Sequence, residues 1–287
     1  MEIKEKFIAA VEKFIAHLSI HPADDVIARL EEMRKHEDSY LQKTIYDSYF
    51  ENLKMASELG RPCCQDTGMI QFFVKAGTGF PHLDITKEVL TEAVRRATAN
   101  VPLRPNAVNF FEETNTGNNL GERSPWIDWE IISGSPEMEI TLYLSGAGCS
   151  LPAQAKVFKP SDGYEAISPF VFDAVCGSGI NACPPLLVGI GLGHNMENAA
   201  VLSKKALLRP LGTHHHHPKG AELEKRITDD LNNLGMGAQG LRGKRCVMGV
   251  HIESSARHTA TIACAVNFSC YMLRRGVIRF KKDLSYE

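Results

Sequence analysis

Three short segments combine cysteine with glycine and polar residues, and they interrupt the regular patterns of the chain. They are residues 61–68 (RPCCQDTG), 177–185 (GSGINACPP) and 251–258 (HIESSARH), the last followed further on by Cys270. Loops of this kind carry binding and catalytic residues more often than helices and strands do. Chemistry is therefore expected at Cys64, Cys183 and Cys270 and at the polar residues beside them.

If these three cysteines meet in space, their thiolates can hold three irons of a cubane iron–sulfur cluster. The fourth iron would then lack a protein ligand, so it could bind a substrate oxygen and act as a Lewis acid that helps hydroxide to leave. The long spacings contain no C-x-x-C pair, and most buried cysteines are simply small hydrophobic residues. Spacing alone leaves two interpretations open, a cluster site and three unrelated buried thiols.

Hydrophobic periodicity predicts an α+β fold, in which a helical N-terminal region packs with a mostly antiparallel sheet. Helices are expected over residues 3–18, 25–37, 38–59, 87–99, 163–177, 195–206 and 219–234, and strands over 69–76, 126–132, 139–144, 246–252 and 261–267. Gly60 is expected to end the third helix and Thr86 to cap the fourth. The turn sequence SGSP at 133–136 predicts that the strands on either side of it form a hairpin.

Length and composition exclude several classes of protein. A chain of 287 residues suits a single domain over 1–287, with room for two lobes that share a core. The formal net charge of −2 lacks the basic excess of a nucleic-acid-binding protein. No apolar run approaches the roughly 18 residues of a membrane span, and the N-terminus lacks an apolar signal sequence. We therefore expect a cytoplasmic protein in which the eight cysteines form no disulfides.

Four consecutive histidines at 214–217 resemble an expression tag, but they lie in the middle of the chain. They are expected to form a native, solvated loop. Imidazoles in such a loop could bind a stray transition metal.

Several motifs together identify a family. The matching stretches are C-Q-D-T-G at 64–68, P-L-R at 102–104, N-T-G at 115–117, N-A-C-P-P at 181–185, K-A-L-L-R-P at 205–210 and H-I-E at 251–253. In these the chain resembles the family formed by the α subunits of L(+)-tartrate dehydratase and the N-terminal domains of class I, iron–sulfur fumarases. The resemblance covers nearly the whole chain. It implies that fold, and one 4Fe-4S cluster held by Cys64, Cys183 and Cys270, whereas Cys63 would only pack.

The resemblance also implies roles for residues around the cluster. Arg104 would bind a substrate carboxylate, which suits the planar fork of a guanidinium; the alternative is a surface ion pair. Gln65 and Asp66 would contact the substrate, with Asp66 in proton transfer, although a carboxylate there could simply cap the loop. His258 would hydrogen-bond near the substrate, and the backbone of Gly146 and Gly148 would meet a carboxylate.

The implied function is that of the α subunit of a hydro-lyase that dehydrates a small hydroxy-dicarboxylate, above all L(+)-tartrate to oxaloacetate and water. The family places the base and further carboxylate-binding residues on another domain or on a separate β subunit, so a partner and an α₂β₂ assembly are expected. The nearest alternative is the α subunit of a two-subunit class I fumarase. A non-catalytic iron–sulfur sensor is an alternative of another class, but it would need neither Arg104 nor the Gln65–Asp66 pair.

Overall fold

The computed structural model describes residues 2–287 and divides them into two compact units. The first unit contains residues 2–23, 51–146 and 274–287, and the second contains 24–50 and 147–273. The chain therefore passes from one unit to the other beside two candidate site segments, after Gly146 and after Leu273. Each unit has its own four-stranded sheet and its own hydrophobic core.

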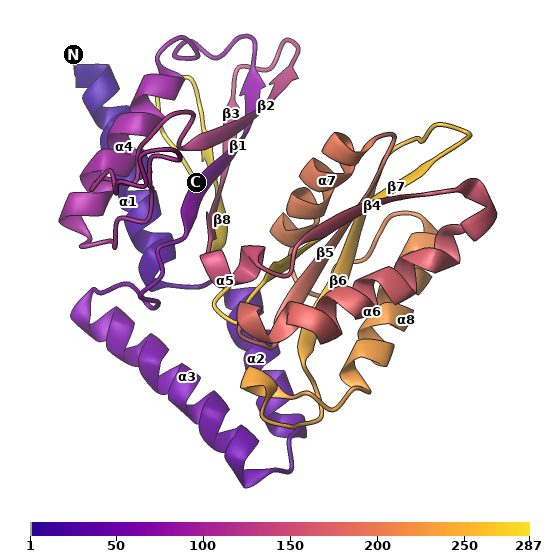
Figure 1. Cartoon of the computed structure of the whole chain (residues 1–287). Helices are drawn as coiled ribbons and strands as arrows, with labels where there is room; N and C mark the ends of the chain where they lie inside the picture. Colours follow the sequence, from indigo (N-terminus) through magenta and orange to yellow (C-terminus); the bar gives the residue numbers. More distant parts are fainter. Residues whose placement is uncertain (1) are drawn as a thin grey trace. The chain divides into compact units, whose positions relative to one another are not determined.

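The first unit is a mixed sheet with two helices against it. Its elements are α1 (Glu2–Ile20), β1 (Met69–Gly77), α4 (Thr86–Asn100), β2 (Trp126–Ile132), β3 (Met138–Ser145) and β8 (Arg275–Phe280). The strand order is β2-β1-β3-β8, in which only the β1–β2 pair is parallel. The apolar stripes of α1 and α4 pack on one face of this sheet (Figure 1). Phe7, Val94 and Phe72 are fully buried in this core.

The second unit is a second mixed sheet with helices on both faces. Its elements are α2 (Asp24–His36), α5 (Ala147–Ser150), β4 (Gln154–Phe158), the 3₁₀ turns η1 (Pro160–Asp162) and η2 (Tyr164–Ala166), α6 (Ile167–Ser178), η3 (Gly179–Ala182), β5 (Leu186–Gly193), α7 (Met196–Leu208), α8 (Pro218–Asn232), η4 (Ala238–Gly240), β6 (Val247–Ser254) and β7 (Ile262–Ser269). Helix α3 (Tyr40–Leu59) crosses the boundary between the units at residue 50. The strand order is β4-β7-β5-β6, and only β5–β6 is parallel.

Alternation along β5 explains how this second sheet is covered. Leu186, Val188 and Ile190 join a core with residues of α6 and α8. Gly189, Gly191 and Gly193 lie against α7, and a Cβ at Gly191 would lie 1.9 Å from the carbonyl oxygen of Ala199. Backbone of the helix and strand therefore touch where no side chain fits. Figure 1 shows α7 on one face and α6 and α8 on the other.

The predicted α+β class is confirmed, and four of the six strand pairs are antiparallel. The predicted hairpin is wrong, because β1 lies between β2 and β3. The segment 133–137 instead crosses the end of β1, where Gly77 donates to the carbonyl of Glu137 at 3.0 Å. Thr86 also does not cap α4; it lies inside the helix and its hydroxyl donates to the carbonyl of His82.

The sequence patterns do not predict three of the strands, namely β4, β5 and β8. The glycine-rich pattern of β5 hides its strand character, because every second residue lacks a side chain. Gly60 ends α3 as expected, with a φ of 60°, while Arg61 donates to the carbonyl of Ala56 at 3.0 Å.

Candidate active site

The loop that carries Cys63 and Cys64 is tied to its own unit through Cys63. The amide of Cys63 donates to the carbonyl of Ser19 at 2.9 Å, and its carbonyl accepts from Asn52 Nδ2 at 2.8 Å. Cys63 is 5% exposed, whereas Cys64 is half-buried. Gln65, beside it, is exposed. The chain thus buries the first thiol as packing and presents the second.

Hydrogen bonds hold both the side chain and the backbone carbonyl of Asp66. Its Oδ1 accepts from the amide of Gly68 at 2.8 Å and from Asn106 Nδ2 at 2.7 Å. Its carbonyl oxygen accepts from Arg274 Nη2 at 2.6 Å. The carboxylate therefore does close its own loop, as a capping residue would, but it also bonds to a side chain from a different segment. No sequence pattern marks Asn106 or Arg274 for this position.

Two glycines bring motif segments together by close approach. Gly68 has a φ of 75°, and a Cβ there would lie 2.5 Å from the carbonyl carbon of Ser145 and 2.8 Å from the nitrogen of Gly146. The C-Q-D-T-G loop therefore rests on the backbone of the expected glycine turn. In the second unit, a Cβ at Gly148 would lie 2.4 Å from the carbonyl oxygen of Asn181. Gly148 thus lets α5 pack against the turn that precedes Cys183.

Arg104 lies in a segment that buried Asn119 organises. Asn119 Oδ1 accepts from the amide of Asn106 at 2.6 Å, and its Nδ2 donates to the carbonyl of Arg104 at 3.2 Å. Asn106 in turn reaches Asp66, so the structure brings the Arg104 segment to the C-Q-D-T-G loop. The Arg104 side chain is exposed and forms no ion pair or hydrogen bond with any of residues 2–287. The surface ion pair considered as its alternative role is therefore absent from the described residues.

The second unit brings Cys183 and Cys270 together around Tyr49. The Tyr49 ring stacks on Tyr271 with centroids 3.8 Å apart, and its hydroxyl donates to the carbonyl of Pro184 at 3.3 Å. The amide of Tyr271 donates to the carbonyl of Cys183 at 3.4 Å. Burial raises the pKa of Tyr49, so the phenol stays a donor. Cys183 has a φ of 53°, a left-handed conformation that is uncommon outside glycine and is often found at functional sites.

Cys149 and Lys204 join these thiols, and neither stood out in the sequence. A hydrogen bond with Cys270 lowers the pKa of Cys149, against the opposing effect of its burial. Burial lowers the pKa of Lys204 to about 8, while the nearby Cys149 opposes that shift. The second unit therefore gathers three thiols and an amine at one place. Cys64 belongs to the first unit.

His258 is not gathered with these thiols. It lies in the exposed loop between β6 and β7, and its Nδ1 accepts from the amide of Ala260 at 3.1 Å. Cys270 follows the other end of β7, so the eight residues of that strand separate the two by about 25 Å. A role for His258 next to Cys270 of the same chain has no support in this arrangement.

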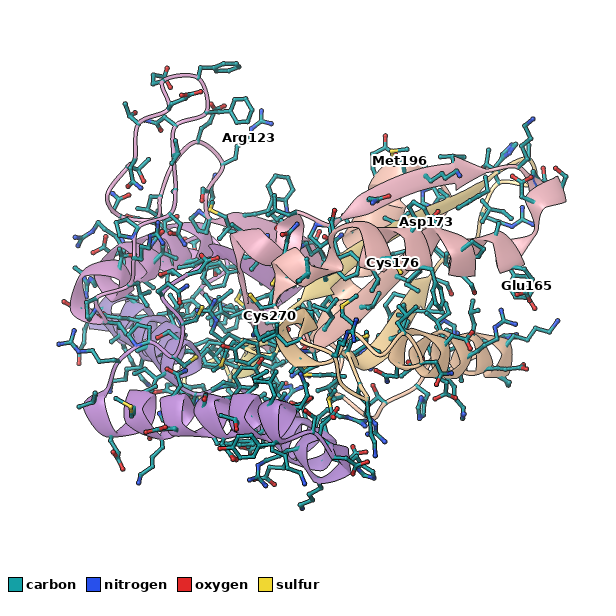
Figure 2. All side chains as sticks on the ribbon, turned by 60° about the horizontal axis from the view of Figure 1, so that its bottom comes forward. Arg123, Glu165, Asp173, Cys176, Met196 and Cys270 are labelled. Atoms are coloured by element: carbon teal, nitrogen blue, oxygen red, sulfur yellow. The ribbon has the colours of Figure 1, made fainter. Side chains whose placement is uncertain are left out.

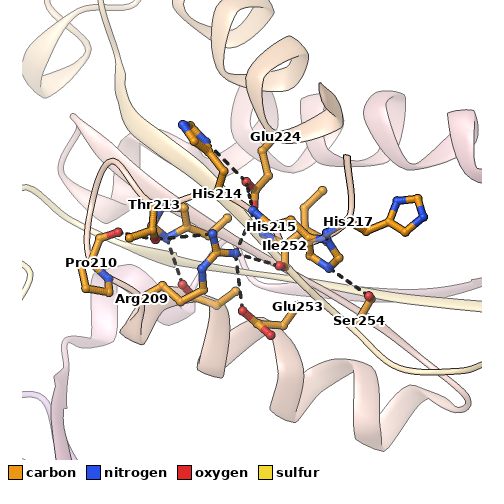
Figure 3. Close-up of polar contacts among 12 residues, drawn as sticks. Arg209, Pro210, Thr213, His214, His215, His217, Glu224, Ile252, Glu253 and Ser254 are labelled. Atoms are coloured by element: carbon orange, nitrogen blue, oxygen red, sulfur yellow. Dashed lines mark hydrogen bonds and ion pairs between the residues drawn. The ribbon is translucent and has the colours of Figure 1, made fainter. Parts of the chain in front are cut away.

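The K-A-L-L-R-P and H-I-E motifs meet at a buried carboxylate instead of at the cysteines. Glu224 on α8 is 1% exposed and accepts from Arg209 Nη1 at 2.9 Å, from the amide of Ile252 at 2.7 Å and from the amide of His215 at 2.8 Å. Figure 3 shows these contacts around Arg209 and Glu224. We call this group, with Glu253 at 3.5 Å from Arg209, the Glu224 cluster. It joins the end of α7 to β6 and α8.

The histidine run belongs to the same region, and the prediction of a solvated loop is wrong for part of it. His215 is buried, and its Nδ1 accepts from the amide of His217, so its Nε2 carries the proton and donates to Ser254 Oγ at 3.1 Å. His217 precedes α8 and its Nδ1 accepts from the amide of Lys219 as a helix cap. Within residues 2–287, no group of three or more His, Cys, Asp or Glu side chains is arranged to hold a metal ion.

Comparison with known proteins identifies the class. A model of the fumarate hydratase (Fumerase) family matches residues 8–279, and the chain belongs to this family of hydro-lyases. The chain is 48% identical over 282 residues to the L(+)-tartrate dehydratase subunit alpha of Escherichia coli strain K12, across 98% of this chain and 93% of that one. The same values hold for the protein of that name from Shigella sonnei.

A more distant relative is the putative L(+)-tartrate dehydratase subunit alpha of Methanocaldococcus jannaschii. The identity is 38% over 281 residues, which cover 97% of this chain and 99% of that one. The predicted family and the predicted enzyme class are therefore confirmed. None of the described helices is long and apolar enough to cross a membrane.

Proposed function

We propose that this chain is the α subunit of a 4Fe-4S-dependent hydro-lyase that dehydrates L(+)-tartrate to oxaloacetate and water. The proposal rests mainly on the loop 64–68, in which hydrogen bonds from Asn106 and Arg274 hold Asp66 in place. Through Asn106, this loop contacts the segment that contains Arg104. The relatives at 48% identity are named for tartrate dehydration. The family model is named for fumarate hydratase, so malate and fumarate are the competing substrates.

The donor set fits an iron–sulfur cluster. Cys64 and Cys270 are half-buried and Cys183 is exposed, so these thiols are not simply residues of a hydrophobic core. Cys183 is also held in a rare backbone conformation. We assign Cys64, Cys183 and Cys270 as the ligands. When bound, a cluster with three protein ligands supplies a Lewis-acidic iron for the departing hydroxyl.

The remaining residues bind and orient the substrate. Arg104 is exposed and has no acidic partner within the described chain, so its guanidinium is available to form two parallel hydrogen bonds with a carboxylate. We assign Gln65, together with the backbone at Gly146, to contacts with the substrate, and Asp66 to proton transfer. For Gly148 a packing role against Asn181 accounts for the glycine. We keep His258 as a residue that hydrogen-bonds near the substrate, although it lies at the opposite end of β7 from Cys270.

A partner subunit would complete this site. Within residues 2–287, the partners described for Asp66 are Gly68, Asn106 and Arg274, and none of them is a base for the C–H proton. The relatives are named as subunits. We propose that a β subunit covers the segment that begins at Arg104. Phe110 and Phe111, further along it, are 86% and 90% exposed. The edge strand β2 of the same unit also exposes Trp126 and Ile131. Exposed apolar groups of this size commonly mark an interface.

The partner contact should be lasting, with more than about 2,000 Å² buried in total, as in obligate complexes. Replacing Phe110 and Phe111 with serine should weaken co-purification of the two subunits without changing the far-ultraviolet circular dichroism of this chain. An unchanged yield of complex would exclude the Phe110–Phe111 segment from the interface. We also propose an α₂β₂ assembly, to be measured by sedimentation; the cytoplasmic location stays a prediction.

The function is tested by co-expressing both subunits without oxygen and assaying tartrate, malate and fumarate side by side. We expect tartrate to be the preferred substrate. We expect this chain alone to be inactive after its cluster has been reconstituted. The complete enzyme should lose activity in air and regain it when iron and a reductant are added. Preference for malate or fumarate would make the enzyme a two-subunit fumarase. Substantial turnover by this chain alone would show that the base is here and that no second subunit is needed.

The cluster ligands are tested by matched serine variants. Cys64→Ser, Cys183→Ser and Cys270→Ser should each lose bound iron and sulfide. Cys63→Ser should keep them, because Cys63 is buried and held through its backbone. A full complement of iron in Cys183→Ser would overturn the assignment.

A further inference from the structure

Arg274 is a large, fully buried charged side chain in the first unit. It is 2% exposed, and its only described side-chain hydrogen bond is the one from Nη2 to the carbonyl of Asp66. Its Nε and Nη1 have no hydrogen-bond partner among residues 2–287. A buried guanidinium without a carboxylate is costly, so its presence calls for a reason other than stability.

Hydrogen bonds to β3 hold the backbone at Arg274 in place. Its carbonyl accepts from the amide of Leu144 at 3.0 Å, and β8, which begins at Arg275, pairs with β3 up to Tyr143. The same end of β3 continues into Ser145, on which Gly68 rests. Arg274 and the loop 64–68 are therefore both anchored to the end of β3.

The contact to Asp66 completes a three-way fixation of that residue. Gly68 and Asn106 hold Oδ1 of the carboxylate, and Arg274 holds the carbonyl. A carbonyl that accepts a charge-assisted bond at 2.6 Å is held firmly. Loss of this bond would free the peptide between Asp66 and Thr67, which belongs to the turn whose Gly68 amide holds the carboxylate.

We propose that Arg274 is a positioning residue for the hydro-lyase reaction: by holding the carbonyl of Asp66, it sets the orientation of the carboxylate that transfers a proton. This role rests on the proposed function of Asp66. Arg274 is only 2% exposed, so it acts on the substrate through Asp66 and not by direct contact. The buried charge is kept for this geometry and at some expense of stability.

The test compares two substitutions with a control on the same strand. Arg274→Met removes the donors and the charge, and Arg274→Lys keeps a charge and a single ammonium donor. Arg279→Met is the control, because Arg279 is an exposed arginine of β8 that pairs with Glu139 at 2.8 Å. Each variant is made in the chain co-expressed with its β subunit and is checked for iron, sulfide and circular dichroism.

For Arg274→Met we expect kcat to fall about 100-fold with KM changed less than threefold, because a displacement of about 1 Å costs that much in rate. Arg274→Lys should recover about tenfold of the loss and stay about tenfold below the wild type, because a single ammonium donor does not reproduce the geometry of the guanidinium. Arg279→Met should match the wild type. A purely structural role would instead lower the folded fraction and the cluster content together. A folded, cluster-loaded Arg274→Met with kcat within threefold of the wild type would overturn the proposal.

Amide hydrogen exchange gives a readout that needs no substrate. Residues 65–68 should exchange faster in Arg274→Met than in the wild type or in Arg279→Met. If Arg274→Met does not fold, Arg274→Lys decides: wild-type kcat together with wild-type exchange in this loop would overturn the proposal. Suppose that loop exchange is faster in Arg274→Met but the wild-type enzyme neither dehydrates tartrate or malate nor hydrates fumarate. That result would support the positioning of Asp66 and refute the proposed reaction instead.

Discussion

Arg209 and Arg274 are two partly or fully buried arginines with opposite surroundings. Arg209 donates to Glu224 and to the carbonyl of Ile252, and Glu253 lies 3.5 Å away. Arg274 has one carbonyl acceptor and two nitrogens without partners in the described chain. Because a buried charge stabilises a fold only when its partners are complete, the first arginine builds the scaffold and the second serves the site.

The same contrast separates the motifs of the family. K-A-L-L-R-P and H-I-E end at the Glu224 cluster, where Arg209, Glu253 and the backbone of Ile252 meet one carboxylate. C-Q-D-T-G and P-L-R end at Asp66 and Arg104, which are exposed or half-buried. A motif shared by a family therefore does not by itself locate chemistry, and the state of its hydrogen bonds is the better guide.

The largest expected loss of stability follows from removing the Glu224 carboxylate, which is the shared acceptor of the Glu224 cluster. Glu224→Ala leaves the Arg209 guanidinium and two buried amides without their acceptor, and it should cost about 3–5 kcal/mol of unfolding free energy. Urea unfolding measures this, with Glu222→Ala, an exposed glutamate on the same helix, as the control. A loss below about 1 kcal/mol would mean that water replaces the carboxylate.

A smaller effect on the free energy of unfolding is expected from removing both charges of the Arg209–Glu224 ion pair. Arg209→Met combined with Glu224→Leu removes both partners of the buried ion pair, and Glu253, which loses Arg209, is partly exposed to solvent. The double variant should therefore lose less stability than the sum of the two single losses, by about 0.5–3 kcal/mol. The double-mutant cycle in urea gives this coupling directly. Strict additivity would show that the two side chains do not act as a pair.

A still smaller stability change is expected at Arg274. Because two of its nitrogens are buried without partners, Arg274→Met should change the unfolding free energy by less than about 1 kcal/mol or raise it, since replacing a poorly paired buried charge is often neutral or stabilising. The measurement is urea unfolding of the isolated chain beside Arg279→Met. A destabilisation as large as that of Glu224→Ala would erase the contrast between the two arginines.

The last prediction concerns two buried cysteine thiols that stay protonated in the folded chain. Burial raises the pKa of Cys246 and of Cys264 to about 12, so at pH 8 only roughly one in ten thousand of these thiols is ionised. Neither should react with iodoacetamide in the folded chain, whereas Cys176, exposed on α6 (Figure 2), should. Mass spectrometry of native and urea-unfolded protein tests this, and equal labelling of Cys246 and Cys176 in the native chain would contradict it.

The sequence by itself determined the family, the α+β class and most helices. Strong 3.6-residue periodicity and tight turn chemistry, such as the stop at Gly60, are local properties that survive without tertiary context. The C-Q-D-T-G and N-A-C-P-P motifs mark Cys64, Asp66 and Cys183 as candidates only through the family resemblance, because the spacing of the cysteines by itself left both a cluster and unrelated thiols open.

Tertiary structure alone decided which of these residues meet. Strand order could not be read from the SGSP turn, because β1 inserts between β2 and β3 through contacts remote in sequence. The partners of Asp66 come from 40 and 208 residues away, and no local pattern records such distances. The separation of His258 from Cys270 follows from the length of β7. Hydrogen bonds between distant segments arise only when the sheets form, so the role of Arg274 could be seen only there.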